Sequence, residues 1–432
     1  MRKTKTFEIG NPEHFKQLLL SWSQQFNEVV WLDSNQHQNK FSAFDGLLAA
    51  DGLTALSTDA LNAFEKLKEY QMQTQDWIFG YLAYDLKNDI EPLVSKNFDG
   101  LEFPELYFFQ PKKIIQVIGN QVHFRYLNMV ADEIAVDFSE ISALTTGNEK
   151  EVVVDKKLHV RMRIFKDEYF RQVQKMLHYI RKGAIYEANF CQEFYVEDCV
   201  INPITIYKKL NEISKAPFAT YMKFFDKYLL CASPERYLKK NGTKLVSQPI
   251  KGTAPRSANK QTDVLLKNEL ETNQKERSEN IMIVDLVRND LSKSALKSSV
   301  RVEELCKVYS FDQVHQMIST ISSKVSADAN AVDLLKDTFP MGSMTGAPKI
   351  SAMQIIEELE AFKRGLYSGA VGYFTPDADF DFNVVIRSIL YNERNKYLSY
   401  AVGSAITEKA IPAKEYEECL LKAKAMRQVL EE

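Results

Sequence analysis

Cysteine is scarce in this chain, and its arrangement excludes several kinds of chemistry. The five cysteines are scattered, their number is odd and no C-x-x-C pair occurs, so neither a disulfide framework nor a zinc site is predicted. None of them lies in a Gly-x-Cys-x-Gly elbow, which would be expected of a glutaminase nucleophile. A reaction that draws nitrogen from glutamine would therefore need a separate subunit.

An excess of positive charge and long apolar runs are also missing. Lys and Arg number 55 against 58 Asp and Glu, a net charge of −3, which gives no basic field for nucleic acid or membrane lipids. No apolar stretch approaches the roughly 18 residues of a membrane span, and no apolar segment follows the basic residues at the N-terminus. We expect a cytoplasmic protein with neither a membrane nor a nucleic acid as partner.

The sequence has enough apolar residues, 45% of 432, for two domains or one large intertwined one. Residues 1–150 contain no chemical motif, and the aperiodic stretch 145–151 is the best linker, so we predict domains at 1–150 and 155–432. Periodicity and turn signals predict helices and strands without a regular βαβ rhythm, which favours an α+β fold. The predicted elements are helices at 167–182, 261–290 with a possible break near Asn273, 348–358 and 412–430, and three strands within 368–406.

A lysine and a glutamate fall on one predicted β-hairpin. Glu235 lies in Ser-Pro-Glu-Arg, Lys251 lies in Pro-Ile-Lys-Gly-Thr, and Asn241-Gly242 between them is a strong turn signal. An amine and a carboxyl group in one dry pocket can act as nucleophile and proton donor, although a cross-strand ion pair is the plainer alternative. With a two-residue Asn-Gly turn the two side chains point to opposite faces, so the catalytic interpretation requires a bulge, a longer loop or a break at Pro234.

Two pairs of glutamates recur at a spacing of three residues. Glu276 and Glu279 lie on one predicted helix, and Glu415 and Glu418 lie on the last one. Residues three apart share a helix face, so each pair presents two carboxylates together. Such hard oxygen ligands suit Mg²⁺, whereas the alternative is an ordinary solvated face.

Two further features concern anions. The turn from Gly342 to Lys349 leads into a helix N-terminus, whose free amides attract anions, but a helix start that needs a tight turn is an equal alternative. Arg387 lies in the apolar run 384–390, read as a strand, and a buried arginine needs a counter-anion. An internal Asp or Glu is the alternative partner of this arginine.

Taken together, these motifs resemble those of the chorismate-utilising enzymes. Ser-Pro-Glu-Arg, Pro-Ile-Lys-Gly-Thr, the run from Glu276 to Asp290 and the turn from Gly342 to Lys349 occur in the family's order, and the resemblance covers roughly residues 160–430. It implies a large antiparallel β-sheet sandwich core with helices packed outside. Lys251 is similar to the lysine of the members that aminate chorismate at C4, where those that form anthranilate typically have alanine.

The resemblance also implies roles for individual residues. Lys251 would attack C2 of chorismate while Glu235 protonates the departing C4 hydroxyl, and ammonia from an amidotransferase subunit would then add at C4 and expel the lysine. The product would be 4-amino-4-deoxychorismate, a precursor of 4-aminobenzoate and folate. The implied Mg²⁺ ligands are Glu276, Glu279, Glu415 and Glu418. The implied substrate-binding residues are Thr253, Thr345, Gly346, Tyr373, Arg387, Gly403 and Lys422.

Two positions depart from the family's pattern. Glu187 stands where most aminating members have Gln, and Gln316 stands at the place of the family's histidine, with His315 one residue early. Glu187 argues against water-adding members, which use lysine there, and Gln316 leaves the aromatising step open. The alternatives to amination at C4 are formation of anthranilate and pyruvate from chorismate, and a non-catalytic chorismate-binding subunit.

Overall fold

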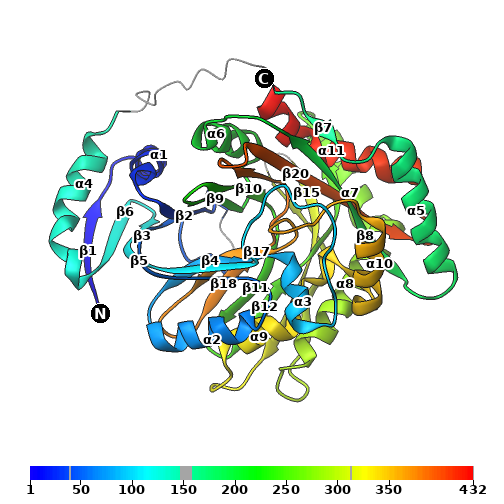
Figure 1. Cartoon of the computed structure of the whole chain (residues 1–432), viewed down its shortest axis with the longest axis horizontal. Coiled ribbons are helices and arrows are strands. Elements are labelled where there is room, and N and C mark those ends of the chain that lie inside the picture. The colour runs from blue at the N-terminus through cyan, green and yellow to red at the C-terminus, as the bar shows by residue number, and fades with distance from the viewer. Residues whose placement is uncertain (38–39, 146–157, 312–313, 432) are drawn as a thin grey trace.

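The computed structural model describes residues 1–37, 40–145, 158–311 and 314–431 (Figure 1). Strands occupy the centre of the molecule, and most helices lie on its outside, with α11 beside α5 near the C-terminus. Apart from Thr145, the predicted linker at 145–151 lies outside the described residues. Among those described, no helix is both long and apolar enough to cross a membrane.

The strands account for most of the interior. Their bounds are β1 Arg2–Glu8, β2 Glu28–Asp33, β3 Gly46–Thr58, β4 Ile78–Leu82, β5 Leu106–Ile118, β6 Gln121–Leu127, β7 Arg161–Met162, β8 Glu187–Val196, β9 Phe218–Phe224, β10 Lys227–Ser233, β11 Arg236–Asn241, β12 Lys244–Gln248, β13 Ile250–Pro255, β14 Arg301–Ser310, β15 Val314–Lys324, β16 Gly346–Ala347, β17 Ala370–Phe374, β18 Phe380–Asn383, β19 Ser388–Asn392 and β20 Tyr397–Thr407.

The helices cover the strands. Their bounds are α1 Pro12–Trp22, α2 Ala63–Thr74, α3 Lys87–Ile90, α4 Ile134–Ala143, α5 Lys166–Arg181, α6 Pro203–Ser214, α7 Lys260–Thr272, α8 Gln274–Ser292, α9 Ala331–Thr338, α10 Lys349–Leu359 and α11 Pro412–Glu431, with a short 3-10 turn, η4, at Gly342–Met344.

The strands form one continuous antiparallel sheet. The ladder runs β8–β20–β19–β10–β9–β2–β3–β5–β4–β17–β18–β11–β12–β15, and β15 also pairs with β13 and β14. This confirms the α+β class and the large antiparallel sheet. Because β2 pairs with β9 and β4 pairs with β17, strands of the two predicted domains share the sheet. The division near residue 150 stays a prediction.

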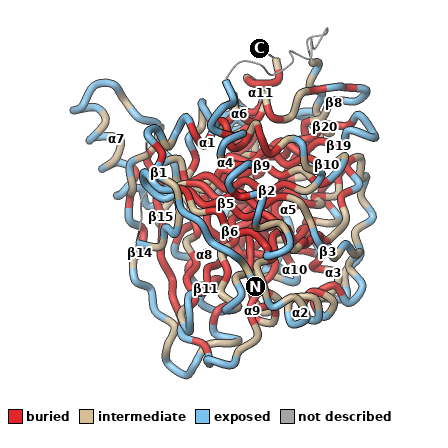
Figure 2. The backbone as a smooth tube through the Cα atoms, turned by 90° about the vertical axis from the view of Figure 1, so that its left-hand side faces the viewer, coloured by how far each residue is buried: buried red, intermediate tan, exposed pale blue. Residues whose placement is uncertain are grey.

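Buried residues are concentrated at the centre of the molecule (Figure 2), and apolar side chains cover both faces of the sheet. One group of apolar side chains lies between the sheet and helices that include α1, α5, α6 and α11. A second lies on the opposite face and includes side chains of β4, β5, β17 and β18. Along β2, Val29 and Trp31 join the first group while Val30 and Leu32 join the second, as the alternation of strand side chains requires.

The predicted helices are confirmed, including the break near Asn273. Asn273 ends α7 and caps α8, because its side chain accepts hydrogen bonds from the amides of Lys275 and Glu276. The expectation of three strands within 368–406 was wrong, since four strands occur there. Arg387 was also misplaced by the sequence, since it lies between β18 and β19 with a φ of +53° and not inside a strand.

The predicted hairpin exists with a different register. The turn residues are Gly242 and Thr243, so Asn241 faces Lys244, and the predicted Asn241-Gly242 turn was wrong by one residue. The register shifts between Arg236 and Lys239, and the chain breaks at Pro234 between β10 and β11. The irregularity that the catalytic interpretation requires is therefore present.

Candidate active site

The first glutamate pair lies at the start of α8. The Asn273 cap fixes this end of the helix, so Glu276 and Glu279 share one face. Glu279 is buried, and burial raises the pKa of its carboxyl to about 7, with Lys251 and Lys275 opposing the shift. Its Oε1 atom has no hydrogen-bond partner. The pair is therefore a poorly solvated acidic site.

The second pair extends from α11 toward β20. Glu415 is buried and accepts a hydrogen bond from the Ser404 hydroxyl. Glu418 pairs with Lys422, at 2.6 Å between Oε1 and Nζ, and Lys422 also donates to the Gly403 carbonyl at 2.8 Å. Burial alone would raise the pKa of Glu418, but Lys422 brings it below its usual value. The structure thus brings together Gly403, Lys422 and Glu418.

A lysine ammonium lies between the two pairs. Lys275 Nζ is 3.3 Å from Glu415 Oε1 and 3.7 Å from Glu279 Oε1. Glu276 interacts electrostatically with Glu418 across the same space, which with burial raises the pKa of Glu276. The predicted metal ligands therefore converge on a cation.

The chemistry of these residues bears on whether they could hold a metal ion. Within the residues described, no three acidic, His or Cys side chains are arranged to surround one. The donor set is nevertheless all carboxylate oxygen, one buried oxygen of Glu279 lacks a partner, and the Lys275 ammonium stands in for a cation among them. Such a set fits Mg²⁺, which prefers hard oxygen ligands.

Lys251 lies beside the glutamates on β13. Its Nζ is 3.2 Å from Glu187 Oε1 on β8. Burial alone would lower the pKa of the Lys251 ammonium, but the charges of Glu187, Glu279 and Glu235 raise it above its ordinary value. The next residue, Gly252, has a φ of +93°, and a Cβ there would lie 3.1 Å from Glu276 Oε2. This left-handed turn holds the lysine against the acidic site.

Glu235 follows the break at Pro234. Its backbone is fixed by the Ser233 hydroxyl at 3.2 Å and by the Val384 amide, which donates to its carbonyl at 3.0 Å. Burial raises the pKa of its carboxyl to about 7, with smaller opposing effects from the Ser343 hydroxyl and Lys251. Close to neutral pH this group can donate a proton, and it interacts electrostatically with Lys251.

Arg387 opens into a cavity of about 330 Å³ that Lys422 and Gln316 also line. Burial lowers the pKa of its guanidinium, while Tyr367 and Glu418 oppose the shift. Arg387 makes no ion pair with any residue in the described part of the chain. The internal Asp or Glu partner considered from the sequence is thus not found there, and the guanidinium suits a bound carboxylate.

The residues predicted to position the substrate ring lie in two places. Gly346 on β16 packs against β8 so closely that a Cβ would lie 2.1 Å from the Glu187 carbonyl oxygen. The buried Thr345 hydroxyl donates to the carbonyls of Met341 and Gly342, both at 3.3 Å. Thr253 lies two residues after Lys251 and is exposed. Glu187 and Gly346 therefore meet close to the lysine.

The turn that precedes α10 contains two internal amide hydrogen bonds. The Met344 amide donates to the Met341 carbonyl, the Thr345 amide donates to the Gly342 carbonyl, and Lys349 pairs with Asp290 at 2.6 Å. The first amides of α10 receive no side-chain cap, so the tight turn and the anion site both stay predictions.

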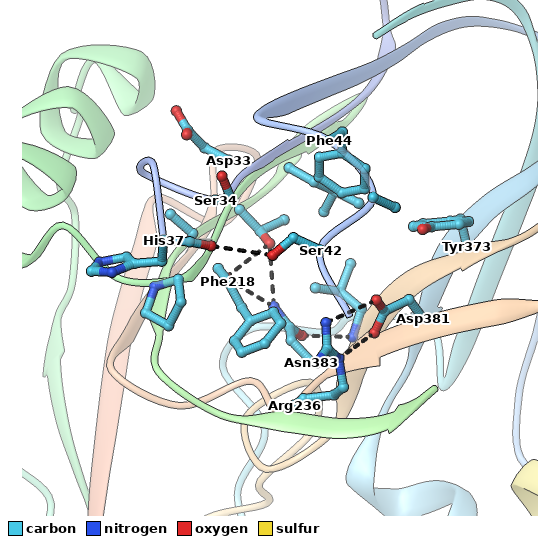
Figure 3. Close-up of a pocket in the computed structure, with 16 residues that line it drawn as sticks. Asp33, Ser34, His37, Ser42, Phe44, Phe218, Arg236, Tyr373, Asp381 and Asn383 are labelled. Atoms are coloured by element: carbon cyan, nitrogen blue, oxygen red, sulfur yellow. Dashed lines mark hydrogen bonds and ion pairs between the residues drawn. The ribbon is translucent and has the colours of Figure 1, made fainter. Parts of the chain in front are cut away.

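Tyr373 lies apart from this cluster, in the cavity shown in Figure 3. There it lies near Phe44 and interacts electrostatically with the Arg236–Asp381 ion pair, in which Nε and Oδ1 are 2.9 Å apart. The structure gives it no contact with Lys251 or Arg387. The tyrosine that interacts with Arg387 is Tyr367, which the sequence reasoning missed.

Gln316 and His315 point to opposite sides of β15. Gln316 lines the Arg387 cavity. His315 is buried between the Ser310 hydroxyl at 2.9 Å and the Asp263 carboxylate at 3.1 Å. His315 therefore does not compensate for the absence of histidine at position 316.

Sequence reasoning missed two more residues of the cluster. Lys275 precedes the first glutamate pair directly, so its adjacency was a usable signal. Asn280 donates from its side chain to the carbonyls of Lys251, at 3.5 Å, and Met317, at 3.3 Å, which ties α8 to β13 and β15. No pattern in the neighbouring sequence predicts these hydrogen bonds of Asn280.

Comparison with known proteins decides the family. The family described as chorismate binding enzyme matches residues 25–428. The chain belongs to the chorismate binding enzyme family.

Relatives of this chorismate binding enzyme carry two different names. It is 33% identical to aminodeoxychorismate synthase component 1 of Bacillus subtilis (strain 168), over 83% of this chain and 77% of that protein. It is also 33% identical to anthranilate synthase component 1 of Saccharolobus solfataricus, over 97% of this chain and 91% of that one. Its identity to a probable chloroplastic aminodeoxychorismate synthase of Oryza sativa subsp. japonica is 42% over 62% of this chain.

Coverage differs among these relatives. The matched part of the chorismate binding enzyme spans only 30% of the rice protein. Among solved structures, anthranilate synthase component I of Streptococcus pneumoniae TIGR4 aligns with a TM-score of 0.78 at 24% identity, covering 91% of this chain and 94% of that one. At that identity the likeness supports the fold alone.

Proposed function

We propose that this enzyme is an aminodeoxychorismate synthase component I, which aminates chorismate with ammonia to 4-amino-4-deoxychorismate for 4-aminobenzoate and folate synthesis. Lys251 carries the proposal, because its amine lies 3.2 Å from Glu187 and interacts electrostatically with Glu279 and with the buried carboxyl of Glu235. An enzyme that only needed to bind chorismate would have no use for a buried amine beside a proton donor.

The first displacement uses Lys251 and Glu235. Lys251 loses its proton to Glu187, 3.2 Å away, and the neutral amine forms a bond to C2 of chorismate. Both ring double bonds shift, the C4–O bond breaks, and Glu235 gives its proton to the departing oxygen, which leaves as water. A pKa of about 7 keeps a large share of Glu235 protonated near neutral pH.

The second displacement installs nitrogen. Ammonia forms a bond to C4, both double bonds shift back, and the C2–N bond breaks, so Lys251 leaves as a neutral amine. The proton of the new ammonium group goes to the Glu235 carboxylate. Ammonia comes from a glutamine amidotransferase subunit in this proposal, since the sequence has no glutaminase elbow of its own.

The remaining residues bind the substrate. Arg387 and Lys422 line one cavity and pair with carboxylate, because both are cationic and Arg387 lacks an ion-pair partner in the described chain. When bound, Mg²⁺ would compensate the negative charge of the substrate, and Glu276, Glu279, Glu415 and Glu418 would hold it. We propose that Gly403, Thr253, Thr345 and Gly346 orient the ring. Tyr373 remains a proposed substrate contact without structural support.

Anthranilate synthesis is the second candidate, favoured by the 33% identity to the Saccharolobus solfataricus protein over nearly the whole chain. Lys251 argues against it, because family members that form anthranilate typically have alanine there. The two functions differ in their product, which is the nonaromatic 4-amino-4-deoxychorismate in the first and the aromatic anthranilate in the second.

The test is chromatography of the products from purified enzyme, chorismate, Mg²⁺ and ammonium, with and without an aminodeoxychorismate lyase. We expect a nonaromatic amine that yields 4-aminobenzoate and pyruvate only when the lyase is added. Fluorescent anthranilate and pyruvate without the lyase would establish the second candidate instead. Isochorismate would mean that water had replaced ammonia as the nucleophile. No conversion, with chorismate still bound, would establish the non-catalytic subunit.

A further inference from the structure

A small interior cavity lies next to Glu235. The proposed function, on which this inference rests, makes Glu235 the proton donor. Its volume is about 20 Å³. Every lining residue is buried, among them Glu235 on one side and Ser343 on η4 on the other. Asp290, Thr338 and Ser247 bring further polar groups to its wall.

Ser343 is a polar group of this cavity that lacks a hydrogen-bond partner among the described residues. Its side chain is buried, with the residue 7% exposed, and its hydroxyl makes no hydrogen bond with any residue that the structure describes. The hydroxyl lies near enough to Glu235 to favour its charged form, but the two groups do not form a direct hydrogen bond here. A buried hydroxyl without a partner is costly, so it requires a ligand.

Two of the other polar groups, Asp290 and Thr338, are already satisfied. Asp290 pairs with Lys349, at 2.6 Å between Oδ2 and Nζ. The Thr338 hydroxyl lies 2.7 Å from the Tyr237 hydroxyl and also donates to main-chain carbonyls. The unmet hydrogen bonds therefore point to the space between Ser343 and Glu235.

We propose that this cavity holds one ordered water molecule that bridges the Ser343 hydroxyl and the Glu235 carboxyl, which makes Ser343 a positioning residue for the proton donor. A cavity needs roughly 10–15 Å³ to admit one water and two to four polar partners to retain it, and this one meets both conditions. The water fixes the orientation of the Glu235 carboxyl group, which makes no direct hydrogen bond with a described residue.

The first test is a crystal structure of the protein at high resolution, alone and as Ser343→Val. We expect a density peak within hydrogen-bonding distance of Ser343 Oγ and Glu235 in the unaltered protein, and none in the variant, whose methyl groups fill the space. An empty or apolar-filled cavity in the unaltered protein would overturn the proposal. This measurement needs no substrate, so it stands or falls separately from the proposed reaction.

The second test compares Ser343→Ala with Ser323→Ala by the rate of chorismate consumption. Ser323 is a matched control, because its hydroxyl is equally buried and unpartnered but lines none of the cavities described here. General acid catalysis is worth about 10²- to 10⁴-fold, so we expect Ser343→Ala to lower kcat by about 10-fold with KM unchanged. Unchanged kcat, or an equal loss in the control, would overturn the positioning role.

Discussion

At the scale of single residues, burial and neighbouring charge set the protonation of the groups around Lys251. The carboxyls of Glu235 and Glu279 both have their pKa raised to about 7, chiefly by burial. Lys251 is also buried, yet its carboxylate neighbours raise the pKa of its ammonium. Before the reaction, Lys251 and a large share of Glu235 and Glu279 are therefore protonated, and the reaction must move some of these protons.

The first prediction concerns Glu235 and stability. The folded protein keeps the Glu235 proton up to about pH 7, while the unfolded chain loses it near pH 4.5, so the free energy of unfolding falls as pH rises between these values. Glu235→Gln avoids this loss. We expect the variant to match the unaltered protein below pH 4.5 and to be more stable by up to about 3 kcal/mol above pH 7.

Urea unfolding at pH 4.5, 6 and 8 measures this effect. The exposed Glu417 supplies the control, since Glu417→Gln removes the same charge from the surface and should show no such trend. A Glu235→Gln variant that is equally stable at every pH would show that the carboxyl is not held neutral.

The second prediction concerns the lysine nucleophile. Chorismate with Mg²⁺ but without ammonia should leave a covalent adduct on Lys251, detectable by peptide mass spectrometry and absent from Lys251→Ala. Glu187→Gln removes the first carboxylate that raises the pKa of Lys251, so a larger fraction of the amine is neutral at a given pH. We expect the acid limb of adduct formation to move to lower pH in that variant. An unmodified Lys251 in a protein that turns over normally once ammonia is added would exclude this nucleophile.

At the scale of elements, α8 and α11 carry the acidic cluster, and the N-cap of α8 positions its first turn. Asn273 caps α8 just before Glu276. Asn259 caps α7 in the same manner, through the amides of Gln261 and Thr262, but no glutamate of the cluster follows it. The two asparagines therefore form a matched pair.

The third prediction follows from that pair. Replacing either asparagine with alanine should cost about 1 kcal/mol in urea unfolding, the usual value of an N-cap. Only Asn273→Ala should also raise the Mg²⁺ concentration that activity requires, because it loosens the turn that carries Glu276 and Glu279. If both variants gave the same Mg²⁺ titration, the Asn273 cap would have no role in positioning the glutamates.

The fourth prediction concerns the glutamates themselves. Glu279→Gln or Glu418→Gln should lower activity at limiting Mg²⁺ by about 10- to 100-fold, the usual cost of disturbing a metal site. Glu417→Gln, one residue before Glu418 and exposed, is the control. Full activity of both variants in a Mg²⁺ titration would mean that the pairs hold no metal.

At the scale of the whole molecule, the N-terminal region is part of the catalytic sheet. Its strands β2 and β4 pair with β9 and β17, and β9 leads through β10 to the break at Pro234 that precedes Glu235. Removing the region would expose two strand edges that are otherwise paired, along with the apolar faces beside them.

The fifth prediction tests the division near residue 150. We expect a fragment of residues 155–432 to aggregate or to unfold without a cooperative transition, measured by circular dichroism, because both edges are unpaired. Coexpression with residues 1–150 should restore a soluble complex. A fragment that melts cooperatively by itself would establish the second region as an independently folding domain.

Local chemistry alone determined several features of this protein. The apolar spacing of α5, the asparagine that separates α7 from α8, and the order of the motifs around Glu235, Lys251 and Glu276 were all readable from neighbouring residues. Each depends on contacts within one turn of helix or one short run of chain, and the sequence specifies those directly.

Only the tertiary structure decided which distant side chains meet. Lys251 on β13 pairs with Glu187 on β8, 64 residues away in the sequence, because the fold brings these two strands to the same site. Tyr367 and not Tyr373 lies near Arg387, and Gln316 and not His315 faces the cavity. One step along a strand reverses the direction of a side chain, so these outcomes depend on register and on bulges, which are set by the packing of the whole sheet.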